Sequence, residues 1–339
     1  MRSVIVPFFI SHLGCPHRCV FCDQQKIAGA KGVLPDAAAI LEKVAQYQAS
    51  APGRELEVAF YGGTFTALPL ADQQRLLDPL QPLLSSGAIR SVRLSTRPDA
   101  VDAGVASFLK SKGVETVELG VQSMDEEVLR LSRRGHSAAD VEAAVSALKK
   151  TGLSAGIQLM PGLPGDSAER SLDTLRRVLS LQPSFLRIYP TLVIAGTELA
   201  ELYQGGHYHP LSLEEAVSLC KQMLVESRRC GVPVIRVGLQ PTSELESPGV
   251  LQAGPYHPAF GQLVESEIWY DIVSAQLAQF PRESLVELSV PMGRVSDVVG
   301  QKRLNVQRLA ENFGVSVLAV REDADLGCEQ VTIKMVLKS

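Results

Sequence analysis

The segment HLGCPHRCVFCDQ, residues 12–24, contains Cys15, Cys19 and Cys22, three of the six cysteines in this 339-residue chain. So few cysteines do not make a disulfide scaffold, and a local cluster of them indicates a metal site. The spacing C-x3-C-x2-C supplies ligands for three irons of a [4Fe-4S] cluster and leaves the fourth iron without a protein ligand. The alternative is a structural zinc site with His12 or His17 as the fourth ligand.

The cysteine segment follows the first of several β-type runs that alternate with helical patterns. Predicted strands are Val4–Ile10, Glu57–Tyr61, Val92–Thr96, Thr116–Val121, Ala155–Met160, Phe185–Tyr189 and Val232–Val237. Predicted helices are Asp36–Gln48, Leu70–Leu84, Ala100–Lys110, Ala138–Lys150, Ala168–Leu181 and Leu213–Arg229. This alternation predicts an α/β fold with a parallel sheet, which repeated right-handed crossovers roll into a full or partial TIM barrel.

Composition supports a globular protein and gives no direct sign of a nucleic-acid partner. Hydrophobic residues make up 45% of the chain and charged residues 21%, and the formal net charge is −4. The apolar run near the N-terminus is short and broken by Pro7, so we expect neither a signal peptide nor a membrane anchor. The predicted location is the cytoplasm.

The pattern changes near Phe280. The remaining segment reads as a strand, one or two helices and two further strands. We therefore predict two domains, a core over residues 1–280 and a small α+β domain over residues 283–339.

The cysteine segment and the motifs that follow it resemble the radical S-adenosylmethionine (SAM) superfamily, in particular the core of the Elongator catalytic subunit. The motifs are GGTFTALP (62–69), TRPD (96–99), ELGVQS (118–123), SRRGHS (132–137), MPGLPGD (160–166) and IYPTLVIAGTEL (188–199). AGPYHPAFGQLVES (253–266) resembles bacterial relatives labelled after oxygen-independent coproporphyrinogen III oxidase. The resemblance implies a partial TIM barrel and, as cofactors, a [4Fe-4S] cluster with SAM bound at its open iron.

The resemblance also implies roles for individual residues. An electron from a donor such as a ferredoxin or flavodoxin would cleave SAM to a radical that attacks a substrate. Glycines let the main chain approach a ligand closely, so bulky replacement at Gly63 is expected to weaken SAM binding and leave the cluster intact. Residues expected to contact SAM are Phe21, Gly62, Gly63, Thr64, Arg97, Gln122, Ser123 and Met160.

Two histidines are the candidates for the substrate side of the site. His136 lies in RRGH and His257 in PYHPAFG, and histidine moves protons or binds carboxylates near neutral pH. A purely structural role is the alternative for both. Ser95 replaces the acid of the family's ETRPD motif, and no acetyltransferase segment follows the core, so acetyl transfer is not expected.

The C-terminal segment resembles a KH module, in which a GXXG loop between two helices clamps a nucleotide backbone. The loop here is Gly300-Gln301-Lys302-Arg303, with arginine in place of the second glycine, and Arg308 adds charge. A packing or dimerisation domain is the alternative. The substrate is unidentified, and we predict RNA or tRNA as a candidate. One alternative is an enzyme that acts on a small metabolite, and the other is a non-catalytic protein that binds RNA and a cluster.

The cysteine assignment predicts about four irons and four sulfides in the anaerobically reconstituted protein. Alanine at Cys15, Cys19 or Cys22 should abolish the brown chromophore, because each thiolate holds one iron. Alanine at Cys220, outside the cluster, should not. Metal analysis and visible absorption spectra check this, and stoichiometric zinc without iron–sulfur absorption would contradict it.

Overall fold

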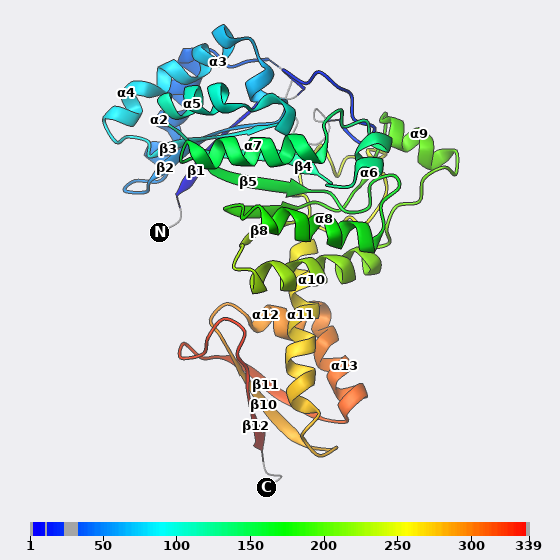
Figure 1. The fold of residues 1–339 in the computed structure, drawn as a ribbon. Coiled ribbons are helices and arrows are strands. Elements are labelled where there is room, and N and C mark those ends of the chain that lie inside the picture. The colour runs from blue at the N-terminus through cyan, green and yellow to red at the C-terminus, as the bar shows by residue number, and fades with distance from the viewer. Residues whose placement is uncertain (1–2, 11, 24–32, 337–339) are drawn as a thin grey trace. The chain divides into compact units, whose positions relative to one another are not determined.

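The computed structural model describes residues 3–10, 12–23 and 33–336. Its largest feature is a seven-stranded sheet in the order β1-β2-β3-β4-β5-β6-β8, in which every neighbouring pair is parallel. The strands are β1 (Val4–Phe9), β2 (Leu56–Tyr61), β3 (Ser91–Thr96), β4 (Val114–Gln122), β5 (Ser154–Leu159), β6 (Phe185–Ile188) and β8 (Val234–Val237). All seven predicted strands are confirmed, and the predicted partial TIM barrel is the observed fold (Figure 1).

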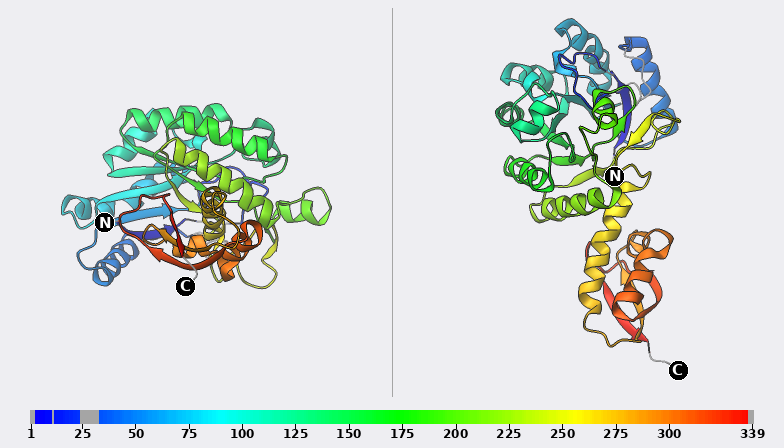
Figure 2. Two further views of the ribbon diagram at one scale, coloured as in Figure 1. Left: turned by 90° about the horizontal axis from the view of Figure 1, so that it is seen from below. Right: turned by 90° about the vertical axis from the view of Figure 1, so that its right-hand side faces the viewer.

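The helices that follow the strands in the chain are α2 (Ala37–Ser50), α3 (Leu70–Leu77), α4 (Gln81–Ser85), α5 (Ala103–Ser111), α6 (Glu126–Leu131), α7 (Ala138–Lys150), α8 (Ala168–Ser180), α9 (Glu198–Gln204) and α10 (Leu213–Arg229). Of these, α2, α5, α7 and α8 lie on the outer side of the curved sheet (Figures 1 and 2). The sequence predicted one helix over Leu70–Leu84, but a 3-10 turn at Asp78–Leu80, containing Pro79, divides it into α3 and α4. Proline removes a backbone donor, which explains the break.

Alternate residues of the strands point to opposite faces of the sheet. One set is apolar and fully buried, for example Val58, Phe60 and Leu94. The other set carries charge: Arg93 pairs with Glu57 at 2.9 Å and with Glu118 at 3.0 Å, and Arg187 pairs with Glu118 at 2.7 Å. Buried charges require such partners, so each of these charged side chains is neutralised by a neighbouring strand.

The chain divides into two compact units. The first contains residues 1–212 and 226–256, and the second contains residues 213–225 and 257–339. The predicted domain boundary at residues 280–283 stays a prediction. The second compact unit also includes earlier residues of the chain, because α11 (Phe260–Leu277) supplies Trp269, Val273 and Leu277 to its hydrophobic core. This long helix was not predicted.

The second unit contains a three-stranded sheet in the order β11-β10-β12. Strand β10 (Leu285–Val290) is parallel to β11 (Ser316–Glu322) and antiparallel to β12 (Thr332–Val336). Helices α12 (Val295–Val299) and α13 (Leu304–Phe313) lie between β10 and β11 in the chain, which confirms the predicted order of elements. In the first unit, β7 (Val193–Ile194) and β9 (Leu251–Ala253) form a separate antiparallel pair. Of the helices that the structure describes, none is long and apolar enough to cross a membrane.

Candidate functional site

The cysteine segment leaves β1 and is tied to two other parts of the first unit. Val20 donates its N–H to Ser132 O at 3.2 Å, and its own carbonyl accepts from Leu199 N at 2.8 Å. Within the segment, Cys22 N donates to Cys19 O at 3.2 Å, which closes a turn. All three cysteines are partly buried. The backbone around the thiols is therefore fixed by main-chain hydrogen bonds.

The glycine turn after β2 packs against the cysteine segment, backbone on backbone. Gly62 and Gly63 have φ values of 76° and 62°. A Cβ added at Gly63 would lie 2.3 Å from Leu13 O, and one added at Gly14 would lie 2.3 Å from Thr64 O. No side chain fits at such distances. Gly63 is thus required for seating the cysteine segment, in addition to its predicted role in SAM binding.

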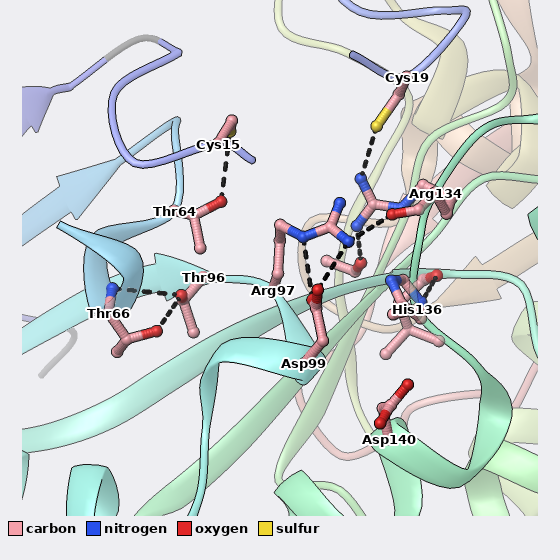
Figure 3. A network of polar contacts seen from close by, with 12 residues as sticks. Cys15, Cys19, Thr64, Thr66, Thr96, Arg97, Asp99, Arg134, His136 and Asp140 are labelled. Atoms are coloured by element: carbon pink, nitrogen blue, oxygen red, sulfur yellow. Dashed lines mark hydrogen bonds and ion pairs between the residues drawn. The ribbon is translucent and has the colours of Figure 1, made fainter. Parts of the chain in front are cut away.

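Thr64 connects the glycine turn to the first cysteine. Its N–H donates to Leu13 O at 2.8 Å, and its Oγ1 lies 3.2 Å from Cys15 Sγ (Figure 3). The Thr64 side chain is fully buried. A contact between Thr64 and SAM stays a prediction, but the structure already assigns this side chain a cysteine as partner.

Arg97, predicted to hold a carboxylate, is paired within its own turn. Its Nε and Nη2 donate to the two carboxylate oxygens of Asp99 at 2.9 and 3.0 Å, and Nη2 also donates to Arg134 O (Figure 3). Only 3% of Arg97 is exposed. Its contact with SAM therefore stays a prediction that competes with a bidentate ion pair.

Arg134 was not predicted, although it stands two positions before His136 in the quoted SRRGHS motif. Its Nη1 donates to Cys19 Sγ at 3.1 Å, and its Nη2 donates to Gly120 O (Figure 3). Two consecutive arginines, Arg133 and Arg134, occur in the motif. Sequence spacing alone did not show which of them turns toward the cysteines.

His136 is a buried, neutral imidazole. Its Nε2 lies 3.1 Å from Val121 O, an arrangement in which Nε2–H donates, and Nδ1 has no hydrogen-bond partner. Burial lowers the pKa of His136 to about 3, and the positive charges of Arg134 and Arg97 add to the effect. The ring therefore carries no charge near pH 7, and its substrate role stays a prediction.

Gln122 and Ser123, at the end of β4, are both buried and hydrogen-bonded within the protein. Gln122 has φ 71°, its carbonyl accepts from Met160 N at 2.9 Å, and its Oε1 accepts from Gln158 Nε2 at 3.1 Å. Ser123 Oγ lies 3.2 Å from Thr174 Oγ1 and accepts from Asp125 N at 3.1 Å. Their contacts with SAM stay predictions.

Phe21 and Met160 share one hydrophobic cluster with two of the three cysteines. Phe21 is buried in it, and Met160, Cys19 and Cys22 pack against it. Two predicted cofactor contacts thus lie together with two of the cysteines.

The second substrate candidate, His257, belongs to the second unit, where its Nδ1 accepts from Ala259 N at 3.0 Å. Its substrate role stays a prediction.

The chemistry of the three thiols fits a cationic group. Burial, together with negative charge on Cys19 and Cys15, raises the pKa of Cys22 to about 12. The pKa of Cys15 is also raised, chiefly by burial. Among the described residues, no three His, Cys, Asp or Glu side chains converge on a single metal ion. A [4Fe-4S] cluster would not require the three sulfurs to converge on one point, because each cysteine would bind a different iron.

Comparison with known families gives two matches. The radical SAM superfamily matches residues 9–178, and the radical SAM C-terminal domain matches residues 183–270. The tRNA uridine(34) acetyltransferase of Methanocaldococcus infernus is 30% identical over 255 residues, which cover 63% of this chain and 48% of that protein. Elongator complex protein 3 of Homo sapiens is 31% identical over 190 residues, 50% of this chain and 35% of that protein.

The fold comparison agrees with the sequence comparison. The structure of archaeal Methanocaldococcus infernus Elp3 with an N-terminal deletion covers 78% of this chain and 62% of its own, with a TM-score of 0.59 and 26% identity. The chain spans about half the length, or less, of the two curated relatives described above.

The glycine turn yields a test of the packing. Gly63→Ala should destabilise the protein and lower its iron content, because the added Cβ displaces the carbonyl of Leu13. This revises the expectation that the cluster survives replacement at Gly63. Gly152→Ala is the matched control, since Gly152 has φ 70° with open space around it. This control measures the cost of placing alanine in a left-handed backbone, about 1 kcal/mol or more, without any steric contact of its Cβ. Iron analysis and thermal unfolding distinguish the two, and equal iron content would contradict the packing argument.

His136 predicts a specific pH dependence of stability. The unfolded chain protonates this histidine near pH 6.5, whereas the folded protein resists protonation down to about pH 3. The unfolded state therefore binds more protons in this window, and stability falls as pH is lowered through it. Replacement of His136 by Gln should reduce the slope of unfolding free energy against pH by up to ~1.4 kcal/mol per pH unit.

Urea unfolding between pH 7.5 and 5 measures this effect. His209→Gln, at an exposed position, is the control and should leave the curve unchanged. Parallel curves for the wild type and His136→Gln would show that His136 is not held neutral.

Proposed function

The chain belongs to the radical SAM superfamily, and we propose that it cleaves SAM reductively at a [4Fe-4S] cluster to start radical chemistry on an RNA substrate. Membership implies SAM and the cluster as cofactors. Cys15, Cys19 and Cys22 would hold the cluster, whose electron cleaves SAM when both are bound. The observation that carries the proposal is the cysteine segment itself, locked to the Gly62-Gly63-Thr64 turn with no room for a side chain.

The residues of the chain prepare this site in three ways. Thr64 Oγ1 lies at hydrogen-bond distance from the sulfur of Cys15. Arg134 Nη1 donates to the sulfur of Cys19. Phe21 and Met160 belong to the hydrophobic cluster against which Cys19 and Cys22 pack, and this apolar surface would limit the access of water to a reactive radical. The loops that carry these residues follow the carboxyl ends of parallel strands, where α/β proteins form their sites.

RNA as substrate is supported first by the similarity to proteins that are named tRNA uridine(34) acetyltransferases. The second support is the loop between α12 and α13. Lys302 and Arg303 are exposed, and no carboxylate pairs with either of them in the described part of the chain. Their φ values are 51° and 63°. Arg303, at the position of the second glycine of a GXXG loop, thus adopts the left-handed backbone usual for glycine.

Arg308, the third basic residue in the prediction, differs from Lys302 and Arg303 because it is paired within the protein. Its guanidinium pairs with Glu267 and lies 3.8 Å from the centre of the Tyr270 ring. The proposed phosphate contacts are therefore Lys302 and Arg303 alone. Two contacts give modest affinity that falls as salt rises.

The proposal is tested by SAM cleavage and RNA binding under anaerobic conditions. The reconstituted protein with dithionite should form 5′-deoxyadenosine from SAM, and nucleoside mass spectrometry of added tRNA should show a modified residue. Cleavage accompanied by a changed small metabolite and unchanged RNA would favour the metabolite alternative. Cluster and RNA binding without any cleavage would favour the non-catalytic alternative.

The loop is tested by charge reversal. Lys302→Glu with Arg303→Glu should weaken binding across RNA sequences, because phosphate contacts carry little base information. The slope of log affinity against log salt should fall by about 0.7 per lost contact on single-stranded RNA. Lys149→Glu with Lys150→Glu, exposed in the first unit, is the matched control. Equal losses in both double variants would remove the loop from the proposal.

A further inference from the structure

Charged side chains cross the concave face of the parallel sheet, the face opposite the outer helices (Figures 1 and 2). Arg93 pairs with Glu57 and Glu118. Arg187 pairs with the same Glu118. The register partner of Arg187 on β8, the last strand of the sheet, is Arg236. Register partners on neighbouring parallel strands point to the same face, so these three guanidiniums share the concave face with two carboxylates.

Arg236 is the guanidinium without a carboxylate partner in the described part of the chain. Its Nη2 donates to Gln240 Oε1 at 2.7 Å. Gln240 follows the end of β8, so the guanidinium reaches toward the carboxyl edge of the sheet, where the cysteine segment also follows β1. The amide of Gln240 is neutral and leaves the positive charge uncompensated. Because Arg187 on the neighbouring strand repels it, Arg236 favours an anion as partner.

Aromatic rings lie on the same face of the sheet. The guanidinium carbon of Arg187 lies 5.8 Å from the centre of the Tyr61 ring, although three strands separate β2 from β6. The curvature of the sheet therefore brings these strands together across the concave face. Phe9, the register partner of Tyr61 on β1, is 40% exposed, and the centres of the two rings are 6.1 Å apart. An exposed aromatic ring offers a surface on which a nucleobase stacks.

A nucleotide has the two chemical parts that this face accommodates. Its base is planar and uncharged, which suits the exposed ring of Phe9. Its phosphate presents oxygens that an arginine binds through two parallel N–H bonds. A ligand with several carboxylates would need several unpaired cations, whereas Arg93 and Arg187 already have acidic partners. The charge at Arg236 matches a single phosphate group.

We infer that Arg236 binds a phosphate group of the RNA substrate, at the nucleotide whose base enters the concave face. This inference rests on the proposed function, because it takes RNA as the substrate. The contact is separate from those proposed for Lys302 and Arg303, which belong to the second unit. Arg236 determines specificity: it selects a nucleotide over a nucleoside or an uncharged metabolite. No bond forms or breaks in this contact.

The first experiment measures protection of Arg236 from phenylglyoxal, a reagent that modifies guanidinium groups. The cluster-loaded protein is treated under anaerobic conditions, and peptide mass spectrometry follows the modification of each arginine. Bulk tRNA, and a mixture of the four ribonucleoside 5′-monophosphates, should each suppress modification of Arg236. The four ribonucleosides and succinate should not. Arg75, exposed on α3 beside Asp72, is the control residue and should react equally in every sample.

The second experiment measures the affinity for bulk tRNA across a salt series. Arg236→Gln should weaken binding about tenfold, the loss of one charge-assisted hydrogen bond. The slope of log affinity against log salt should fall by about 0.7, the value for one contact to a single strand. Arg236→Lys retains the charge and should lose less. Arg75→Gln is the matched control and should bind tRNA as the wild type does.

Three results would overturn the inference. One is protection of Arg236 by ribonucleosides or by succinate as strong as that by the monophosphates, because phosphate would then not be the group recognised. The others are an unprotected Arg236 in the presence of tRNA, and an unchanged tRNA affinity in a folded Arg236→Gln protein. The protection experiment uses the wild type and needs neither SAM nor catalysis. Protection by tRNA in a protein that never cleaves SAM refutes the proposed radical chemistry and supports the phosphate contact.

Discussion

The structure of the site depends on one steric constraint, the contact between two backbones at Gly14 and Gly63. Carbonyl oxygens of Leu13 and Thr64 occupy the space where side chains of these glycines would lie. The N–H of Thr64 then bonds to Leu13 O at 2.8 Å, and its hydroxyl meets Cys15. A loop seated in this way has little freedom, so the three thiols are presented in a fixed arrangement before any iron is bound. Such preorganisation reduces the entropy that cluster assembly must overcome.

Most of the buried charges described in the first unit are paired with one another. On the strands, Glu57, Arg93, Glu118 and Arg187 neutralise one another and need no ligand. Around the cysteines the balance is different, because His136 is kept neutral and Arg97 is paired with Asp99. Of the described side chains, Arg134 places a positive charge at hydrogen-bond distance from a cysteine sulfur, that of Cys19.

Much of this was predictable from the sequence because local patterns determine it. Strand–helix alternation predicted all seven strands of the parallel sheet, and the motifs placed Gly63, Gln122 and Met160 at strand ends. Contacts between distant segments were not predictable in this way. The Asp99 partner of Arg97 and the Cys19 partner of Arg134 depend on side-chain direction, which sequence spacing does not fix. The long helix α11 was not among the predicted helices, although Trp269 and Val273 on it pack into the core of the second unit.

The second unit shows why substrate recognition is harder to infer than cofactor binding. Cofactor binding is encoded in motifs whose backbone geometry permits few residue types, as at Gly63. Recognition of RNA phosphate needs only exposed charge, which many surfaces offer. Lys302 and Arg303 are exposed, and their left-handed backbone is costly for residues other than glycine. This strained loop, with two exposed cations at its tip, is the feature on which the proposed phosphate contacts rest.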